Sequence, residues 1–162
     1  CIYVSTLLPS LVRPDLSHAS IELLWVQLKT LPHPTYVGVC YRPPGQKVDK
    51  RNEFLNHLEF SIQRIISMNT NAIYLLGDLN DRCVIWDSEH TDSELGNSLV
   101  DMANSYGLTQ LINVPTHYST PSARNTEPSA NLLDIILTDP PNTICHSGTE
   151  APIGKSHHSL IF

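Results

Sequence analysis

Several features that would assign this protein to a particular class are absent from its sequence. No stretch approaches the roughly 18 uninterrupted apolar residues of a membrane-spanning helix, so no membrane span is predicted. The N-terminus has neither the basic region nor the extended apolar core of a signal peptide. The four cysteines, at positions 1, 40, 83 and 145, include no Cys-x-x-Cys pair. This spacing disfavours a zinc ribbon and does not call for an oxidising compartment.

Positive charge is also scarce, because 10 lysine and arginine residues are set against 16 acidic residues, for a formal net charge of −6. Phosphate-rich partners usually bind a basic surface, so this balance weighs mildly against a nucleic-acid partner. The objection is not decisive, since a bound metal ion can supply positive charge at a phosphate. The eight histidines can add further positive charge below neutral pH.

The residues that are present indicate one globular domain. A chain of 162 residues, 41% apolar and 16% charged, is long enough to bury a core. Residues 1–162 contain no repeat or linker that would indicate a second domain. The chain has no initiator Met and begins with Cys1–Ser5, which resembles a strand. We therefore expect it to be a fragment of a longer protein.

Apolar periodicity predicts interspersed strands and helices. The predicted strands are 21–31, 36–41, 73–76, 132–137 and a terminal strand that ends the segment 155–162. The predicted helices are 49–68, capped by Asp49, and a second one from the capping box Thr91–Glu94 to the terminator Gly107. The polar segments 115–131 and 139–156 are predicted loops. A hairpin together with helix-linked strands favours an α/β layered domain with mixed sheets.

The string Gly77-Asp78-Leu79-Asn80 is the most informative feature of the sequence. It follows an apolar run that predicts a buried strand, and Gly77 is expected to let the backbone turn at the strand's end. Asp78 and Asn80 are two residues apart, so in an extended chain they point the same way. A carboxylate beside an amide can accept a proton, ligate a metal and donate hydrogen bonds, as phosphoryl chemistry requires. The alternative is an ordinary polar turn.

Asp134 interrupts the apolar run 132–137, and a buried charge is costly unless it is paired. The candidate partner is His158, in a polar segment near the C-terminus. An aspartate paired with a histidine fixes the imidazole tautomer and stabilises its protonated form, as in catalytic dyads and triads. The alternatives are that Asp134 faces solvent on an edge strand and that His157 and His158 are surface residues.

Tyr41 ends a predicted strand just before Arg42-Pro43-Pro44. A phenol at a strand end can hydrogen-bond a phosphate oxygen. Tyrosine is also common in cores, and packing in the core is the alternative.

The order of these strings resembles the endonuclease/exonuclease/phosphatase superfamily, and more closely the apurinic-type endonuclease domain of non-LTR (LINE-type) retrotransposon polyproteins. The resemblance spans essentially the whole chain. It rests on the strings Tyr41-Arg42-Pro43-Pro44, Gly77-Asp78-Leu79-Asn80 with Trp86 following, Pro115-Thr116, Leu133-Asp134-Ile135-Ile136 and Ser156-His157-His158.

The resemblance implies a two-sheet β-sandwich flanked by helices, like deoxyribonuclease I, without its first strands. It also implies site roles. Asp78 matches the carboxylate that activates water, and Asn80 matches the amide that holds the phosphate. Tyr41 matches a phosphate-contacting tyrosine, and Asp134 matches the partner of the catalytic histidine, His158. Thr116 falls in a segment that approaches DNA in the retrotransposon proteins, which marks it as a substrate-binding candidate.

The same resemblance implies Mg²⁺, with Mn²⁺ as an alternative, as cofactor. It implies DNA as substrate, and a reverse transcriptase linked within the parent polyprotein. The protein is expected to be an intracellular monomer without a membrane association, nuclear when it acts on chromosomal DNA. The expected activity is metal-dependent phosphodiester hydrolysis that nicks the target DNA.

Two departures from the family pattern bear on activity. The family's main metal-binding glutamate lies upstream of anything in this chain, so the fragment alone is expected to be inactive. The family has an aspartate beside the metal where this chain has His157. The alternatives are therefore a catalytically dead remnant of the domain, or a phosphatase or phosphodiesterase of the same superfamily that acts on a substrate other than nucleic acid.

Overall fold

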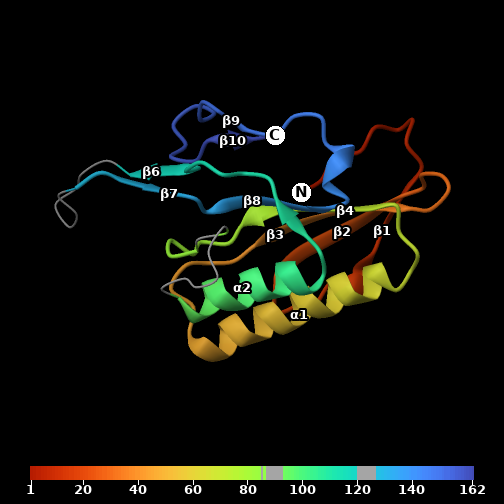
Figure 1. Cartoon of the computed structure of the whole chain (residues 1–162), viewed down its shortest axis with the longest axis horizontal. Helices are drawn as coiled ribbons and strands as arrows, with labels where there is room; N and C mark the ends of the chain where they lie inside the picture. The colour runs from red at the N-terminus through yellow and green to blue at the C-terminus, as the bar shows by residue number, and fades with distance from the viewer. Residues whose placement is uncertain (85, 87–92, 120–126) are drawn as a thin grey trace.

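The computed structural model describes residues 1–84, 86, 93–119 and 127–162 (Figure 1). The elements, in chain order, are β1 (Ser10–Val12), the short 3₁₀ helix η1 (Pro14–Leu16), β2 (Glu22–Leu28), β3 (Thr35–Tyr41), α1 (Val48–Ile66), β4 (Ala72–Asp78), α2 (Glu94–Ser105), β5 (Thr109–Gln110), β6 (His117–Ser119), β7 (Ser129–Asn131), β8 (Asp134–Asp139), the 3₁₀ helix η2 (Pro141–Thr143), β9 (Thr149–Glu150) and β10 (Leu160–Ile161).

Six strands form the main sheet, in the order β1-β2-β3-β4-β8-β5. β2 and β3 form the predicted antiparallel hairpin, whereas β3 and β4 are parallel and are joined through α1. β8 returns antiparallel beside β4. In Figure 1 α1 and α2 lie together against one face of this sheet, and the pair β9–β10 lies on the side away from the helices. The predicted mixed α/β layering is confirmed.

The core lies between the sheet and the two helices. Trp25 on β2 is fully buried, and its indole N–H donates to the Ser61 hydroxyl of α1 at 3.1 Å. Gly38 on β3 provides the space for this ring, since a Cβ there would lie 2.6 Å from it. Burying a large apolar side chain contributes about 1.5–3 kcal/mol. The helices supply Phe54, Leu58, Ile62, Ile65 and Leu99 to the same core.

The helices lie where the sequence predicts them, but their caps differ. Asp49 was expected as a cap, and it lies instead in the first turn of α1 after Lys47, where an acid still suits the helix dipole. Ser93 caps α2, because its hydroxyl accepts from the Gly96 N–H at 2.7 Å. The predicted cap Thr91 lies outside the described residues. No helix in the described part of the chain is both long and apolar enough to cross a membrane.

Several strand boundaries differ from the sequence predictions. Cys1–Ser5 was expected to be a strand, but the first strand is β1, which pairs with β2. The predicted loop 115–131 contains the hairpin partners β6 and β7, and the predicted loop 139–156 contains β9. These strands are only two or three residues long, and they depend on cross-chain pairing that no local apolar pattern signals.

Gly77 has a different role from the predicted turn. It lies inside β4, in register with Cys40 of β3. A Cβ at Gly77 would lie 2.0 Å from the carbonyl oxygen of Cys40 and 2.8 Å from its sulfur. Glycine is therefore needed here because two backbones approach closely, and this contact fixes the end of β4 that carries Asp78.

We predict that Gly77→Ala destabilises the fold by about 2–3 kcal/mol or more, because the backbone of β3 must move away. For a chain of this size the melting temperature should fall by roughly 5 °C or more. Gly148→Ala is the matched control, since its Cβ would meet only the movable Phe162 ring at 3.3 Å. Thermal unfolding of both variants checks the prediction, and equal stability of Gly77→Ala and the parent chain would refute it.

Candidate active site

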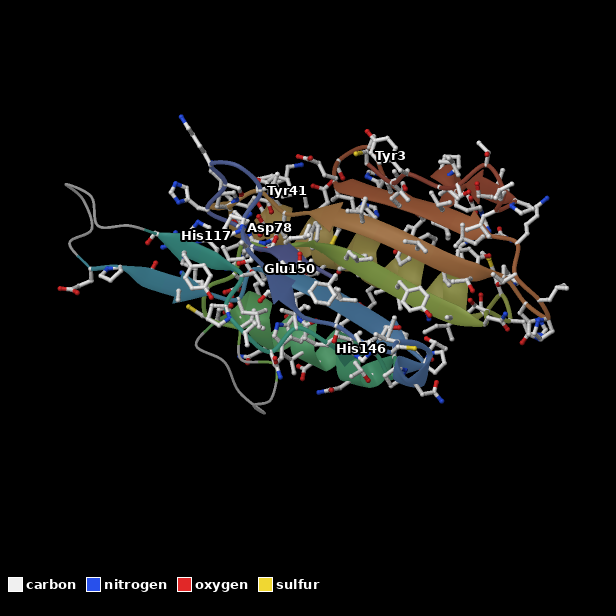
Figure 2. The ribbon with its side chains drawn as sticks, turned by 90° about the horizontal axis from the view of Figure 1, so that it is seen from above. Tyr3, Tyr41, Asp78, His117, His146 and Glu150 are labelled. Carbon is white, nitrogen blue, oxygen red and sulfur yellow. The ribbon has the colours of Figure 1, made fainter. Side chains whose placement is uncertain are left out.

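The ends of three adjacent strands bring together the predicted site residues of the main sheet. Asp78, the last residue of β4, is in register with Tyr41 at the end of β3 and with Asp134 at the start of β8. Residues paired across neighbouring strands project from the same face of a sheet. Figure 2 shows Tyr41 beside Asp78, with His117 labelled at the same end of the sheet. Three of the predicted site residues thus lie together at one end of the main sheet.

Asp134 and His158 form the predicted pair. Oδ2 of Asp134 lies 2.8 Å from Nδ1 of His158, within hydrogen-bond distance. The Asp134 side chain is 17% exposed and that of His158 is 34% exposed, so the pair is partly shielded but open on one side. The alternatives of a solvent-facing aspartate and a free surface histidine are not what the structure shows for these two residues.

Asn80 donates two hydrogen bonds to the Asp78 carboxylate. Its backbone N–H donates to Oδ1 of Asp78 at 2.9 Å, and its side-chain amide donates to Oδ2 at 3.0 Å. Asn80 has a φ of +49°, in the left-handed region where asparagine is one of the tolerated residues. The string after β4 is therefore a tight loop that wraps around the Asp78 carboxylate.

The environment of Asp78 raises the pKa of its carboxyl group, which makes the carboxylate more basic. Burial raises the pKa of Asp78, and the nearby negative charge of Asp134 raises it further. The hydrogen bonds from Asn80 and the charge of His158 lower the pKa but do not cancel the effect of burial. A carboxylate with a raised pKa accepts a proton more readily than an ordinary aspartate does.

Arg42 is a site residue to which sequence reasoning gave no role. Its side chain is buried, and it donates to the backbone carbonyls of Leu79 at 2.5 Å and of Asn80 at 2.7 Å. The backbone carbonyl of Arg42 accepts in return from the Asn80 side-chain amide at 3.0 Å. Burial lowers the pKa of Arg42, while Asp81 and Asp78 oppose this effect. Arg42 thus fastens the loop that carries Asp78 and Asn80 to the end of β3.

Thr116 differs from its expected role, because it is fully buried and holds the backbone of the site together. Its hydroxyl accepts from the N–H groups of Leu133 at 3.1 Å and of Asp134 at 3.0 Å. Its carbonyl accepts from the Ser159 N–H at 2.7 Å. The resemblance suggested a DNA contact, whereas in this structure Thr116 positions both Asp134 and the segment that carries His158.

Two predicted residues are exposed at the site. Tyr41 is 38% exposed, so its phenol is not part of the core, and the core-packing alternative is wrong. His157 is also exposed, and among the described residues it does not join the cluster of close ligand atoms formed by Asp78, Asp134 and His158. The backbone carbonyl of His157 accepts from the Tyr118 N–H at 3.0 Å.

His117 is a further neighbour that sequence reasoning missed. Its ring meets that of His158 edge to face, with the ring centroids 4.7 Å apart, and the two residues also form a backbone bridge. Burial lowers the pKa of His117, and the charge of His158 lowers it further. Among the contacts of the described residues, Nδ1 of His117 has no hydrogen-bond partner. Its only sequence signal is a position two residues after the Pro115-Thr116 string.

The donor set at the site fits a divalent cation. Ligand atoms of Asp78, Asp134 and His158 all lie within 4.8 Å of one another. Carboxylate oxygens are the ligands that Mg²⁺ and Mn²⁺ prefer, whereas imidazole suits softer metals. Because Nδ1 of His158 already contacts Asp134, the two carboxylates are the groups that would hold the ion.

Solved structures show which fold this is. The endonuclease domain of TRAS1, a telomere-specific non-LTR retrotransposon, superposes with a TM-score of 0.74 at 18% identity over 97% of this chain and 68% of its own. A 3′ phosphatase from Neisseria, NExo, gives 0.60 at 16% identity over 85% and 62%. An AP endonuclease from Archaeoglobus fulgidus gives 0.55 at 16% identity over 85% and 63%. The chain thus has the deoxyribonuclease I-like fold and spans about two thirds of these structures.

Sequence comparison assigns the family. No curated protein matches the chain. The family described as endonuclease-reverse transcriptase matches residues 35–162, a range that includes every residue of the candidate site. Because this match covers well over half of the sequence, the chain belongs to the endonuclease-reverse transcriptase family.

Proposed function

We propose that this chain is the catalytic portion of a metal-dependent DNA endonuclease domain, which nicks target DNA for a reverse transcriptase in the same polyprotein. The observation that carries the proposal is the Asp134–His158 pair at 2.8 Å, set beside Asp78 and Asn80 where three strand ends meet. Membership of the endonuclease-reverse transcriptase family supports both the reaction class and the linked partner. The domain would act as a monomer on chromosomal DNA in the nucleus.

In this proposal Asp78 is the general base. Its partial burial strengthens it as a proton acceptor, and the hydrogen bonds from Asn80 aim its oxygens. It would take the proton of the attacking water as the new P–O bond forms. A bound Mg²⁺ or Mn²⁺, held by Asp78 and Asp134, would supply positive charge near the phosphate oxygens.

The remaining residues would bind the phosphate and stabilise its charge. His158, oriented by Asp134, would donate a hydrogen bond to a phosphate oxygen as negative charge develops there. Tyr41 is exposed at the adjoining strand end, where its phenol could donate to a second oxygen. The Asn80 amide would contact the phosphate by exchanging its hydrogen bond with the Arg42 carbonyl or with Asp78.

A catalytically inactive remnant that only binds DNA is the second candidate. The observation that favours it is His157, an exposed imidazole at the position where the family has a metal-adjacent aspartate. The nicking assay described below separates the two candidates, since a remnant has no activity for a substitution at His158 to remove.

We predict that His158→Ala slows nicking of supercoiled plasmid by the parent polyprotein by roughly 10²–10⁴-fold, the range for loss of a positioned proton donor. His146→Ala, another exposed histidine, should leave the rate unchanged. The assay is run with Mg²⁺ and repeated with EDTA, which should abolish nicking. An EDTA-resistant rate, or one that His158→Ala leaves intact, would count against the assignment.

A second prediction concerns the pKa of Asp78, measured by carboxyl NMR titration of the metal-free chain. The pKa should exceed the ordinary value of 3.8, and Asp134→Asn should lower it by removing a facing negative charge. Because the folded pKa is raised, this carboxyl stabilises the fold most below pH 3.8 and loses that contribution as the pH rises through the folded pKa. Asp101→Asn, at an exposed site on α2, is the control. An Asp78 pKa that does not respond to Asp134→Asn would contradict the described proximity.

A further inference from the structure

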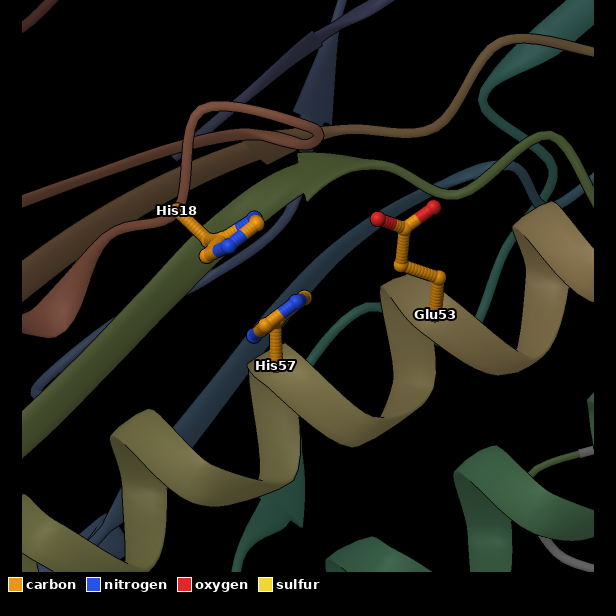
Figure 3. Close-up of side chains that lie close together, drawn as sticks. All are labelled: His18, Glu53 and His57. Carbon is orange, nitrogen blue, oxygen red and sulfur yellow. The ribbon is translucent and has the colours of Figure 1, made fainter.

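A second group of metal-ligand side chains lies outside the candidate active site. It consists of His18, in the segment that follows η1, and of Glu53 and His57 on α1 (Figure 3). Ligand atoms of the three residues all lie within 4.8 Å of one another. None of them takes part in the chemistry proposed above, so the group calls for its own explanation.

The helix places two of the three ligands. Glu53 and His57 are four residues apart on α1, a spacing that puts both side chains on one face of a helix. The His18 ring stacks on that of His57, with the centroids 3.8 Å apart and the planes 11° from parallel. Figure 3 shows the two rings face to face, with the Glu53 carboxylate to one side of the stack. The three side chains therefore gather above one face of the helix, and the two stacked rings must turn out of parallel for a nitrogen of each to face the same ion.

One nitrogen of the His18 ring is held by hydrogen bonds to Ser20. Nδ1 of His18 lies 2.7 Å from the Ser20 hydroxyl and accepts from the Ser20 backbone N–H at 3.3 Å. A metal-binding imidazole donates its other N–H to a neighbouring acceptor, so binding through Nε2 requires the tautomer in which Nδ1 donates to the Ser20 hydroxyl. We therefore assign Nε2 as the ligand atom of His18. The neighbouring residue Leu16 is buried in the core and fixes the segment from the other side.

Glu53 carries the charge that such a site needs. Its carboxylate accepts from Lys50 at 2.7 Å, and this hydrogen bond lowers the pKa of Glu53, as does one from Ser20. The group is therefore an anion at neutral pH. Lys50 is exposed on a flexible stem, so it can move aside when a cation takes its place.

We propose that His18, Glu53 and His57 bind one Zn²⁺ ion, which links the segment before β2 to α1. Two imidazole nitrogens and one carboxylate oxygen are a frequent zinc ligand set, with water completing the tetrahedron. This set is too nitrogen-rich for Mg²⁺, which selects oxygen ligands. Metal–ligand distances of about 2.0–2.2 Å require the three side chains to close in from their present separation. They are exposed or partly exposed, so they have room to do so.

Bound zinc is expected to cross-link two parts of the chain that are distant in sequence, the segment before β2 and α1. A metal that binds only the folded state stabilises it in proportion to the logarithm of its concentration. At about one hundred times the dissociation constant, Zn²⁺ should raise the melting temperature by roughly 5 °C or more for a chain of this size. The site thus acts on stability and leaves the nuclease residues untouched.

The test is zinc titration of the 162-residue chain, by calorimetry for stoichiometry and by thermal unfolding for stability. The background variant is His158→Ala, which breaks the other cluster of close ligand atoms, so that zinc bound there does not confuse the result. In that background we expect one zinc equivalent and a raised melting temperature. His18→Ala, Glu53→Gln and His57→Gln should each weaken binding by at least about tenfold and abolish the thermal shift.

His33→Ala is the matched control, because it removes an exposed histidine outside the cluster and should bind zinc normally. The proposal is overturned if His18→Ala binds zinc as tightly as its background does, or if that background binds no zinc at micromolar concentration. Zinc binding that needs an intact His158 would likewise place the ion in the candidate active site and refute a separate one. Each single-ligand variant removes an exposed or partly exposed side chain, so folding without zinc should be preserved.

Discussion

The structure depends on one unfavourable juxtaposition, two carboxylates opposite each other on neighbouring strands. Asp78 and Asp134 are a register pair of β4 and β8, and like charges in that position destabilise an antiparallel ladder. The neighbourhood compensates for this cost. His158 contacts the Asp134 carboxylate, and Asn80 donates two hydrogen bonds to Asp78. The buried, positively charged Arg42 is hydrogen-bonded to the loop that follows Asp78. The groups that make the pair tolerable are also those that the proposed hydrolysis uses, so the stability and the chemistry of this corner cannot be separated.

Much of this arrangement can be predicted from the sequence, because the layers of the fold and the residues of the candidate site each leave a local sequence pattern. Apolar runs mark the central strands and helical periodicity marks α1 and α2, so the layers follow from patterning. Polar residues that end or interrupt those runs, such as Asp78 and Asp134, then become candidates for strand-end sites. The family-like order of the sequence motifs adds His158 as the partner of Asp134. The structure places His158 at hydrogen-bond distance from Asp134.

The remainder depends on contacts between segments far apart in the chain, which no local pattern encodes. In the sequence Arg42 is only the residue between a predicted strand and two prolines. In the structure its side chain donates hydrogen bonds to backbone carbonyls 37 and 38 residues away in the chain. Thr116 resembles a loop residue, yet its hydroxyl and carbonyl join β8 to the C-terminal segment. Gly77 resembles a turn residue, yet the reason for it is the Cys40 carbonyl of the neighbouring strand. In each case the residue type was visible, but its partner became apparent only in the fold.

The measurement that tests the account most directly is a double-mutant cycle on nicking by the parent polyprotein, with Asp134→Asn, His158→Ala and the two combined. If Asp134 acts by orienting His158, the aspartate has nothing left to orient once the imidazole is gone. Asp134 is also proposed to hold the ion, so the assay is run at saturating Mg²⁺. The account predicts that Asp134→Asn then slows the His158→Ala variant by a much smaller factor than it slows the parent. Losses that multiply in the double variant would show that the two residues act independently, which would contradict the paired site described here.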